Sequence, residues 1–193
     1  FKGKIMYQIM VDRFNGVNVN KDKYKDYIFH DNWSDCPNYL SINGKILNND
    51  FFGGNFRGII DKIDYLKSLN ISVIYLNPIF LAPSNHKYNT SDYLTIDPMF
   101  GTEDDFYELV TVLKENGIYL IIDGVFNHTG DDSIYFNKYN HFPQLGAYQS
   151  VDSKYYNWYK FISFPNKYES WWGIDTLPSV NQNSSFPNFI EEI

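Results

Sequence analysis

Three polar residues of different chemistry lie within six positions at the end of one apolar run. The stretch is IIDGVFNHTG, residues 121–130, and it contains Asp123, Asn127 and His128. A carboxylate can stabilise positive charge, an amide oxygen can bind a hard cation, and an imidazole can hydrogen-bond a hydroxyl group. Two of them also have a plain structural interpretation. Asp123 could cap a helix, and His128 could be a packed core histidine. The neighbouring elements therefore decide whether these residues form a site.

Three apolar runs have the composition of buried strands. They cover residues 4–11, 71–78 and 118–126, and the third is apolar on both faces, as in a sheet covered on both sides. We expect strands here, with Asn77 and Asp123 at the carboxyl ends of the second and third strands.

Two helices are predicted between these strands. In the segment 58–70, four apolar residues fall on one helical face: Ile59, Ile63, Leu66 and Leu69. Asn70 suits the left-handed position that follows a helix. The second helix begins at a cap formed by Thr102 and Asp105 and ends at Gly117. Its apolar stripe consists of Phe106, Leu109, Val110 and Leu113.

The alternation of strands and helices predicts parallel βαβ units. In such folds functional groups gather at the carboxyl ends of strands, so Asn77 and Asp123 lie on the face that carries a site. A doubly wound nucleotide-binding sheet needs a glycine-rich phosphate loop, and the sequence contains neither G-x-G-x-x-G nor G-x-x-x-x-G-K. The pattern favours a barrel, in which long insertions after strands are common.

The composition argues against several classes of function. The 193 residues carry a net charge of −7 and only two arginines, so no basic surface for nucleic acid is expected. No apolar run approaches the roughly 20 residues of a membrane span. The single cysteine, Cys36, is interpreted as a free thiol. The 17 Tyr, 16 Phe and 4 Trp residues suit either a filled core or surfaces that stack on sugar rings.

Five blocks of the sequence resemble successive conserved blocks of the α-amylase family of glycoside hydrolases, in the family's order. Four of them are YQIMVDRFNG, FFGGNFRGIIDKIDYLKSLNISVIYLNPIF, NHKYNTSDYLTIDPMFGT and GIYLIIDGVFNHTG. The fifth, SWWGIDTLPSVN, resembles a motif in the inserted domain of neopullulanases, cyclomaltodextrinases and amylopullulanases. Together the blocks cover nearly the whole chain, which makes the resemblance specific.

The resemblance implies an α/β fold, the N-terminal portion (about three strands) of a TIM (β/α)8 barrel with an irregular subdomain inserted after the third strand. Residues 1–128 would belong to the barrel, 129–185 to the insertion and 186–193 to the start of the next barrel helix. The implied reaction is retaining cleavage of α-1,4 or α-1,6 glucosidic bonds in α-glucans such as starch and pullulan. It uses a carboxylate nucleophile and a second carboxyl group as acid/base.

Residue roles follow from the matching positions of the family. His128 would hydrogen-bond the sugar at the cleavage subsite, Tyr88 would stack under it, and Asp123 would support the catalytic carboxylates. Asp92 and His86 match positions near the same sugar.

The resemblance also implies calcium. Asn127 matches a ligand that fixes the inserted domain to the barrel in many members, which suits an ion that prefers oxygen ligands. A second site in some relatives uses the Asp of a GGD motif, but here the motif is GGN, with Asn55, beside Asn15 and Asn18. Because an amide attracts a hard cation less than a carboxylate does, we do not expect this second site to bind calcium.

The two catalytic carboxyl groups are missing from these 193 residues. The family nucleophile is an Asp two positions after an Arg, whereas Arg13 is followed two positions later by Asn15 and Arg57 by Ile59. None of the six glutamates ends a strand-like run, as the acid/base would. We therefore expect an inactive part of a longer catalytic domain. Its open barrel edge would cause either self-association or poor order after residue 128.

Two other classes of function stay open. Some amylase-like chains have lost catalysis and serve as partner subunits, and a stand-alone carbohydrate-binding fragment is a further alternative. Trp171 and Trp172 are interpreted either as sugar-stacking platforms or as the core of the inserted domain. Four retained residues favour an enzyme: Asp123, Asn127, His128 and Tyr88. The sequence is compatible with a secreted, cell-surface or cytoplasmic location.

Overall fold

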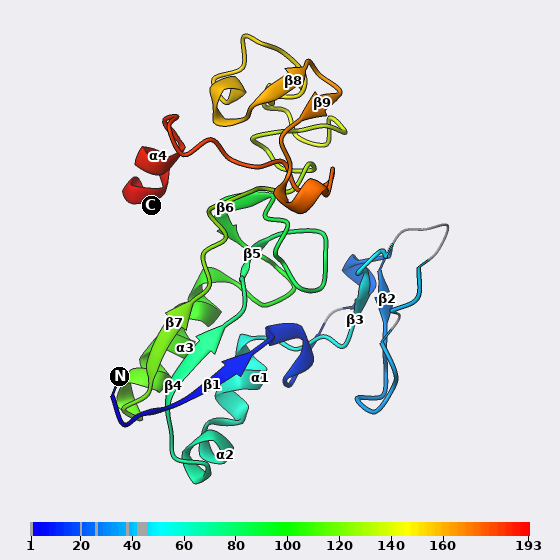
Figure 1. Cartoon of the computed structure of the whole chain (residues 1–193). Coiled ribbons are helices and arrows are strands. Elements are labelled where there is room, and N and C mark those ends of the chain that lie inside the picture. The colour runs from blue at the N-terminus through cyan, green and yellow to red at the C-terminus, as the bar shows by residue number, and fades with distance from the viewer. Residues whose placement is uncertain (1, 20, 26, 38, 42–45) are drawn as a thin grey trace. The chain divides into compact units, whose positions relative to one another are not determined.

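The computed structural model describes residues 2–19, 21–25, 27–37, 39–41 and 46–193 (Figure 1). The chain divides into two compact units, each built from several separate segments. Unit 1 comprises Phe1–Ile79, Ser84–His86 and Ile96–Asp123, and unit 2 comprises Phe80–Pro83, Lys87–Thr95 and Gly124–Ile193. Each unit has its own hydrophobic core, so the two are described separately.

A three-stranded parallel sheet forms the centre of unit 1. Its strands are β1 (Ile5–Ile9), β4 (Ile71–Leu76) and β7 (Tyr119–Ile122), in the order β1-β4-β7 (Figure 1). The carboxyl ends are aligned, because Leu76 pairs with Ile9 on one side and with Ile122 on the other. The predicted parallel βαβ units are confirmed, and each strand lies within its predicted run.

Helices α1 (Phe56–Asp61), α2 (Ile63–Ser68) and α3 (Glu103–Glu115) share a largely aliphatic core with the sheet. Its buried members include Ile59, Leu66, Leu109 and Leu113 from the helices and Ile9, Ile74 and Leu76 from the strands. The predicted apolar faces therefore supply the contacts that hold the helices to the sheet.

The prediction of one helix over residues 58–70 is wrong, because α1 and α2 are separate. Lys62 between them has φ −99° and ψ 13°, outside the α-helical region. A straight helix would direct all four predicted apolar residues inward, whereas here Ile63 is half-buried and Leu69 is 40% exposed. The left-handed Asn70 (φ 56°) is confirmed.

Helix α3 has the predicted start and end. Thr102 Oγ1 accepts a hydrogen bond from the Asp105 backbone N–H (3.1 Å), and Asp105 Oδ2 accepts one from the Thr102 backbone N–H (2.8 Å). This reciprocal box satisfies amide groups that have no partner inside the helix. Gly117 follows the helix with φ 69°.

The outer strands of the sheet carry exposed apolar side chains. Ile5, Met6 and Tyr119 are 51%, 48% and 53% exposed, and Ile122 is 38% exposed. The prediction that the third apolar run is covered on both faces is therefore wrong for Tyr119 and Ile122. The physical reason is that β1 and β7 form the two edges of the sheet in the part of the chain that the structure describes.

Buried charges organise the long polar loop after β1. Its regular pieces are η1 (Val11–Arg13), η2 (Lys21–Lys23), β2 (Ile28–Phe29) and β3 (Asp50–Phe51). Asp12 Oδ1 accepts a hydrogen bond from the Gly53 backbone N–H (3.0 Å). Arg13 pairs with both Asp12 and Asp50, and His30 Nε2 lies 3.1 Å from Asp50 Oδ2. Ion pairs thus hold this polar sequence together with ring contacts on the buried Phe51 and Phe52.

Unit 2 contains little regular structure. Strands β5 (Phe80–Leu81) and β6 (Asp92–Ile96) pair, and β8 (Phe161–Ser163) pairs with β9 (Lys167–Tyr168). Short helical pieces are η3 (Tyr156–Trp158), η4 (Trp171–Gly173) and α4 (Phe186–Glu192), of which α4 is the helix predicted at residues 186–193.

Aromatic side chains form the core of unit 2. Its large buried members are Tyr93, Tyr135, Phe136, Tyr155, Trp158, Tyr159, Tyr168 and Phe186. Phe136 is fully buried, and its ring centroid lies 4.8 Å from the centroids of Tyr159 and Tyr168 in edge-to-face contacts. Many of the aromatic residues of the sequence therefore pack in this core.

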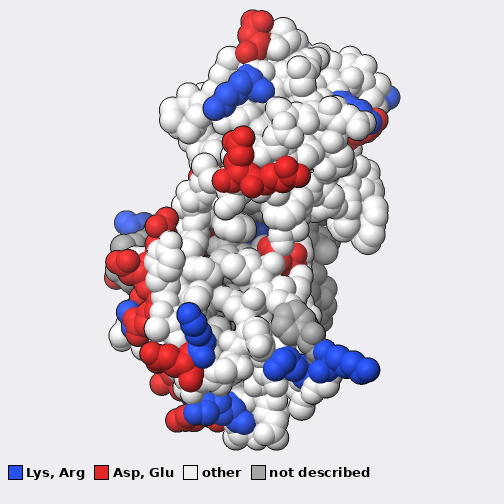
Figure 2. All heavy atoms as spheres, turned by 90° about the vertical axis from the view of Figure 1, so that its left-hand side faces the viewer, with Lys and Arg blue, Asp and Glu red and all other residues white. Residues whose placement is uncertain are grey.

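The surface fits the charge of the sequence. Among the described residues, no helix is long and apolar enough to cross a membrane. On the face drawn in Figure 2, Lys and Arg side chains lie in separate groups among Asp and Glu side chains. This face has no continuous basic stripe, in keeping with the net charge of −7.

Candidate functional site

The carboxyl edge of the sheet brings Asn77 and Asp123 to adjacent strand ends. The Asn77 backbone N–H donates to the Ile9 carbonyl (2.9 Å), and the Asp123 backbone N–H donates to the Leu76 carbonyl (3.0 Å). The Asn77 side chain accepts a hydrogen bond from Gln8 Nε2 (2.8 Å). Both predicted strand ends therefore carry polar groups at the same edge of unit 1.

Asp123 acts on a neighbouring phenol. Burial first, and then a hydrogen bond and the negative charge of Asp123, raise the pKa of Tyr75 above its ordinary value. Tyr75 lies on β4, the strand next to the one that Asp123 follows, where it pairs with Ile121. Asp123 is thus oriented by the sheet and not by a helix that it caps.

His128 is a buried imidazole with one occupied and one free nitrogen. Its ring is 2% exposed, and Nε2 lies 3.0 Å from the Tyr88 carbonyl oxygen, which can only accept. Nε2 therefore carries the proton, and Nδ1 has no hydrogen-bond partner within the described part of the chain. Desolvation lowers the pKa of His128 below 6.5, partly opposed by the Tyr88 bond, so the ring is neutral near pH 7.

A close approach of two backbone segments positions His128 against Tyr88. The Gly130 backbone N–H donates to the Thr90 carbonyl (2.9 Å). A Cβ at Gly130 would lie 2.7 Å from the Asn89 carbonyl oxygen, so only glycine permits this spacing. The final glycine of the motif IIDGVFNHTG thus keeps the His128 segment in contact with the Tyr88 segment.

The other three predicted substrate residues have different surroundings. Tyr88 is half-buried in unit 2. His86 belongs to unit 1, where Nε2 lies 3.2 Å from Asn48 Nδ2 and Nδ1 lies 3.2 Å from Ser84 Oγ.

Asp92 uses its carboxylate inside unit 2. Oδ1 accepts from the Leu94 backbone N–H (3.0 Å) and from the Tyr135 hydroxyl (3.2 Å), and Oδ2 accepts from Thr95 Oγ1 (2.7 Å). Burial, together with the Asp92 charge, raises the pKa of Tyr135 far above its ordinary value. These bonds make Asp92 a support of the aromatic core, whatever else it contacts.

The amide residues of the first loop do not fit a calcium site. Asn55 Oδ1 caps α1 by accepting from the Gly58 backbone N–H (2.8 Å), and it also accepts from the Val17 backbone N–H (3.3 Å). Its Nδ2 donates to the Val17 carbonyl (2.7 Å), and Asn15 Nδ2 donates to the Gly58 carbonyl (3.1 Å). The amide oxygen of Asn55 is thus occupied by donors.

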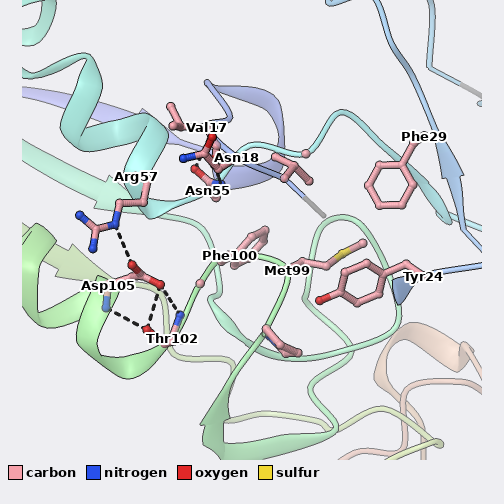
Figure 3. Close-up of a pocket in the computed structure, with 14 residues that line it drawn as sticks. Val17, Asn18, Tyr24, Phe29, Asn55, Arg57, Met99, Phe100, Thr102 and Asp105 are labelled. Carbon is pink, nitrogen blue, oxygen red and sulfur yellow. Dashed lines mark hydrogen bonds and ion pairs between the residues drawn. The ribbon is translucent and has the colours of Figure 1, made fainter. Parts of the chain in front are cut away.

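Figure 3 shows Asn18 and Asn55 beside Val17 at one end of a pocket of about 960 Å³. The pocket is lined mainly by apolar side chains, and the Arg57–Asp105 ion pair lies at another part of its wall. The one carboxylate among the described lining residues, Asp105, is paired with Arg57 (2.7 Å).

Asn127 presents an exposed side chain, while its carbonyl accepts from the Val180 backbone N–H (3.0 Å). One amide oxygen supplies only one of the roughly six to eight ligands that calcium takes. Within the described residues, no group of three or more His, Cys, Asp or Glu side chains is placed to hold a metal ion. Asn127 is therefore a suitable calcium ligand in kind but does not define a site alone.

Sequence reasoning missed a buried cation beside the predicted Tyr88. Lys87 is 1% exposed, has φ 62°, and donates from Nζ to the Ala82 carbonyl (2.7 Å). Nothing in the polar segment NHKYN distinguishes this lysine from a surface one. The tryptophan pair of the ESWWG segment did stand out in the sequence. Trp171 stacks on the predicted site residue His128, with ring centroids 5.0 Å apart.

The fold defines the class of protein. A parallel βαβαβ sheet with polar groups at its carboxyl edge, followed by a long irregular segment, is the arrangement of part of a TIM barrel. Comparison with known proteins gives the family, because residues 8–192 match the family described as Alpha amylase, catalytic domain. The chain belongs to the α-amylase family.

Individual relatives place the chain within the family. The amylopullulanase of Thermoanaerobacterium saccharolyticum is 49% identical over 98% of this chain, and the cyclomaltodextrinase of Thermoanaerobacter pseudethanolicus is 44% identical over 84% of it. This chain spans 17% and 25% of the length of those two proteins. The solved type III pullulan hydrolase of Thermococcus kodakarensis is 33% identical, with a TM-score of 0.80, over 97% of this chain and 34% of that one.

These similarities confirm the predicted family, its amylopullulanase and cyclomaltodextrinase branch, and the partial TIM-barrel fold. The roles of individual site residues stay predictions.

Proposed function

We propose that this chain forms part of the catalytic domain of an enzyme that hydrolyses α-glucans with retention at the anomeric carbon. Family membership, and the amylopullulanase and cyclomaltodextrinase among its relatives, support the proposal. The observation that carries it is the neutral, buried His128, whose Nδ1 has no partner in the described chain, set against Tyr88.

His128 and Tyr88 would hold one glucose unit. The Nε2–H group of His128 is bound to the Tyr88 carbonyl, which leaves Nδ1 as an acceptor. Because Nδ1 is covered in this structure, a sugar hydroxyl would reach it once the side chains around the ring move aside. A buried acceptor without a donor costs free energy, so a hydroxyl placed there would be favoured. The Tyr88 ring would stack on the same unit. His86 and Asp92 are proposed as further substrate-binding residues.

Asp123 would stabilise the positive charge that develops on the sugar in the oxocarbenium-like transition state. Bond cleavage also needs a nucleophile and an acid/base, and the 193 residues contain neither carboxyl group at a matching position. Residues 1–193 alone are therefore expected to release no reducing sugar from pullulan or starch.

We propose the same division of the chain as the sequence predicts: barrel for residues 1–128, insertion for 129–185 and the next barrel helix from 186. Asn127 would contribute one oxygen to a calcium ion between barrel and insertion. In the part of the chain that the structure describes, β1 and β7 are the outer strands of the sheet, and with the exposed Ile5 and Met6 they would cause residues 1–193 to self-associate when isolated.

The test is hydrolysis of pullulan and starch by the complete polypeptide that carries this chain. Asp123→Asn should lower kcat about 100-fold, whereas Asp64→Asn, on the exposed face of α2, should leave kcat unchanged. A complete polypeptide that binds maltohexaose but hydrolyses neither substrate would overturn the proposal in favour of a non-catalytic amylase-like subunit.

A further inference from the structure

A stack of three aromatic rings runs from the buried histidine to the surface of unit 2. The centroids of His128 and Trp171 are 5.0 Å apart at an interplanar angle of 29°, and those of Trp171 and Trp172 are 4.1 Å apart at 12°. His128 is 2% exposed, whereas Trp172 is 82% exposed, the highest value among the large hydrophobic side chains described as exposed. The stack therefore ends in an indole ring that faces solvent.

The backbone holds Trp172 in an unusual conformation. Its φ of 53° and ψ of 24° lie in the left-handed region, which bulky residues avoid. The loop around it is fixed by hydrogen bonds from the Trp171 backbone N–H to the Leu177 carbonyl (2.9 Å) and from the Gly173 backbone N–H to the Ser170 carbonyl (3.2 Å). Apart from its contact with Trp171, the exposed side chain of Trp172 contributes little to packing, so its strained conformation indicates a function outside the core.

The surroundings favour a sugar over a protein as the occupant. One face of the Trp172 ring is covered by Trp171 in near-parallel contact, and the side chain is otherwise exposed. In the same loop Asp175 and Thr176 are exposed and polar, and Ile174 (43% exposed) is the one further exposed large hydrophobic residue, so the apolar surface of this loop is small compared with a protein interface. A flat apolar face bordered by polar groups matches a pyranose ring, which has an apolar C–H face and hydroxyl groups at its edge.

We propose that Trp172 is a stacking platform for one glucose unit of the bound α-glucan, two ring layers from His128. The inference rests on the proposed function and extends it, because it assigns a binding position to a residue of the ESWWG segment. The Trp171 ring, packed against the Trp172 ring, would hold the Trp172 ring in its orientation.

The experiment measures binding of maltohexaose to the complete polypeptide by titration calorimetry. Trp172→Ala should weaken binding roughly two- to tenfold, as expected for the loss of one aromatic stacking contact. Trp172→Tyr, which keeps a flat ring, should restore most of the affinity. Trp33→Ala removes a tryptophan that is 46% exposed in unit 1 and should leave the affinity unchanged.

A glycine variant separates binding from folding. Trp172→Gly removes the ring and relieves the left-handed strain, so it should weaken binding as much as Trp172→Ala while the thermal midpoint stays equal or rises. Unchanged maltohexaose affinity in Trp172→Ala would overturn the inference, even if the enzyme hydrolyses pullulan. Concentration-dependent association that Trp172→Ala abolishes and maltohexaose does not displace would overturn it in favour of a contact between copies.

Discussion

In unit 1 the buried side chains are mostly aliphatic and lie on a hydrogen-bonded parallel sheet, whereas in unit 2 they are mostly aromatic and lie on turns. The first arrangement aligns strand ends, so it places Asn77 and Asp123 by backbone register. The second places His128 by ring contacts and by the close approach at Gly130. Two ways of positioning polar groups therefore coexist in one chain.

This difference predicts how strongly a core substitution destabilises each unit. Phe136→Ala in unit 2 should destabilise that unit by about 3–5 kcal/mol, because it leaves a large cavity among closely packed rings. Leu66→Ala in unit 1 should cost about 2–5 kcal/mol while the sheet persists. Amide hydrogen exchange, read separately for each unit, measures both effects. Equal loss of protection in both units for either variant would break the comparison.

A smaller effect is expected at a helix start. Thr102→Ala should destabilise unit 1 by about 1 kcal/mol, because the capping box of α3 is lost. Thr102→Ser keeps the hydroxyl and serves as the matched control. In unit 2 the residue before α4, Ser185, makes no capping bond. A thermal midpoint of Thr102→Ala equal to that of the serine variant would show that the box contributes nothing.

The smallest effect depends on pH and is confined to unit 2. The folded state lowers the pKa of His128 below 6.5, so the unfolded chain binds this proton more tightly. The contribution of the neutral His128 to the free energy of unfolding is fully present above pH 6.5. It is lost as the pH falls from 6.5 through the folded-state pKa of His128, by at most about 1.4 kcal/mol per pH unit. Denaturant unfolding of wild type and His128→Gln between pH 7.5 and 5 should converge at the acid end, with His141→Gln as control. Parallel curves would contradict a desolvated His128.

The sequence predicted unit 1 better than unit 2, for a physical reason. Local rules govern strands and caps, so β4 and the Thr102 box could be read from neighbouring residues. The break at Lys62 depends on how two helical turns meet the sheet, which no local pattern records.

The candidate site shows the same limit. The resemblance picked out His128 and Tyr88, but not the hydrogen bond that joins the ring of one to the backbone of the other. Burial of Lys87 and the left-handed Trp172 arise from contacts between distant segments. Periodicity and composition carry no information about such contacts.

The interleaving of the two units has a consequence for folding during synthesis. The Tyr93 hydroxyl donates to the Val125 carbonyl (2.5 Å), and its oxygen lies 3.1 Å from the His128 carbonyl oxygen; these residues lie 32 and 35 positions later in the chain. During synthesis Tyr93 therefore cannot form these contacts until α3 and β7, which belong to the other unit, have been made. Neither unit can finish from one continuous stretch, so folding in this chain is expected to be simultaneous and not domain by domain.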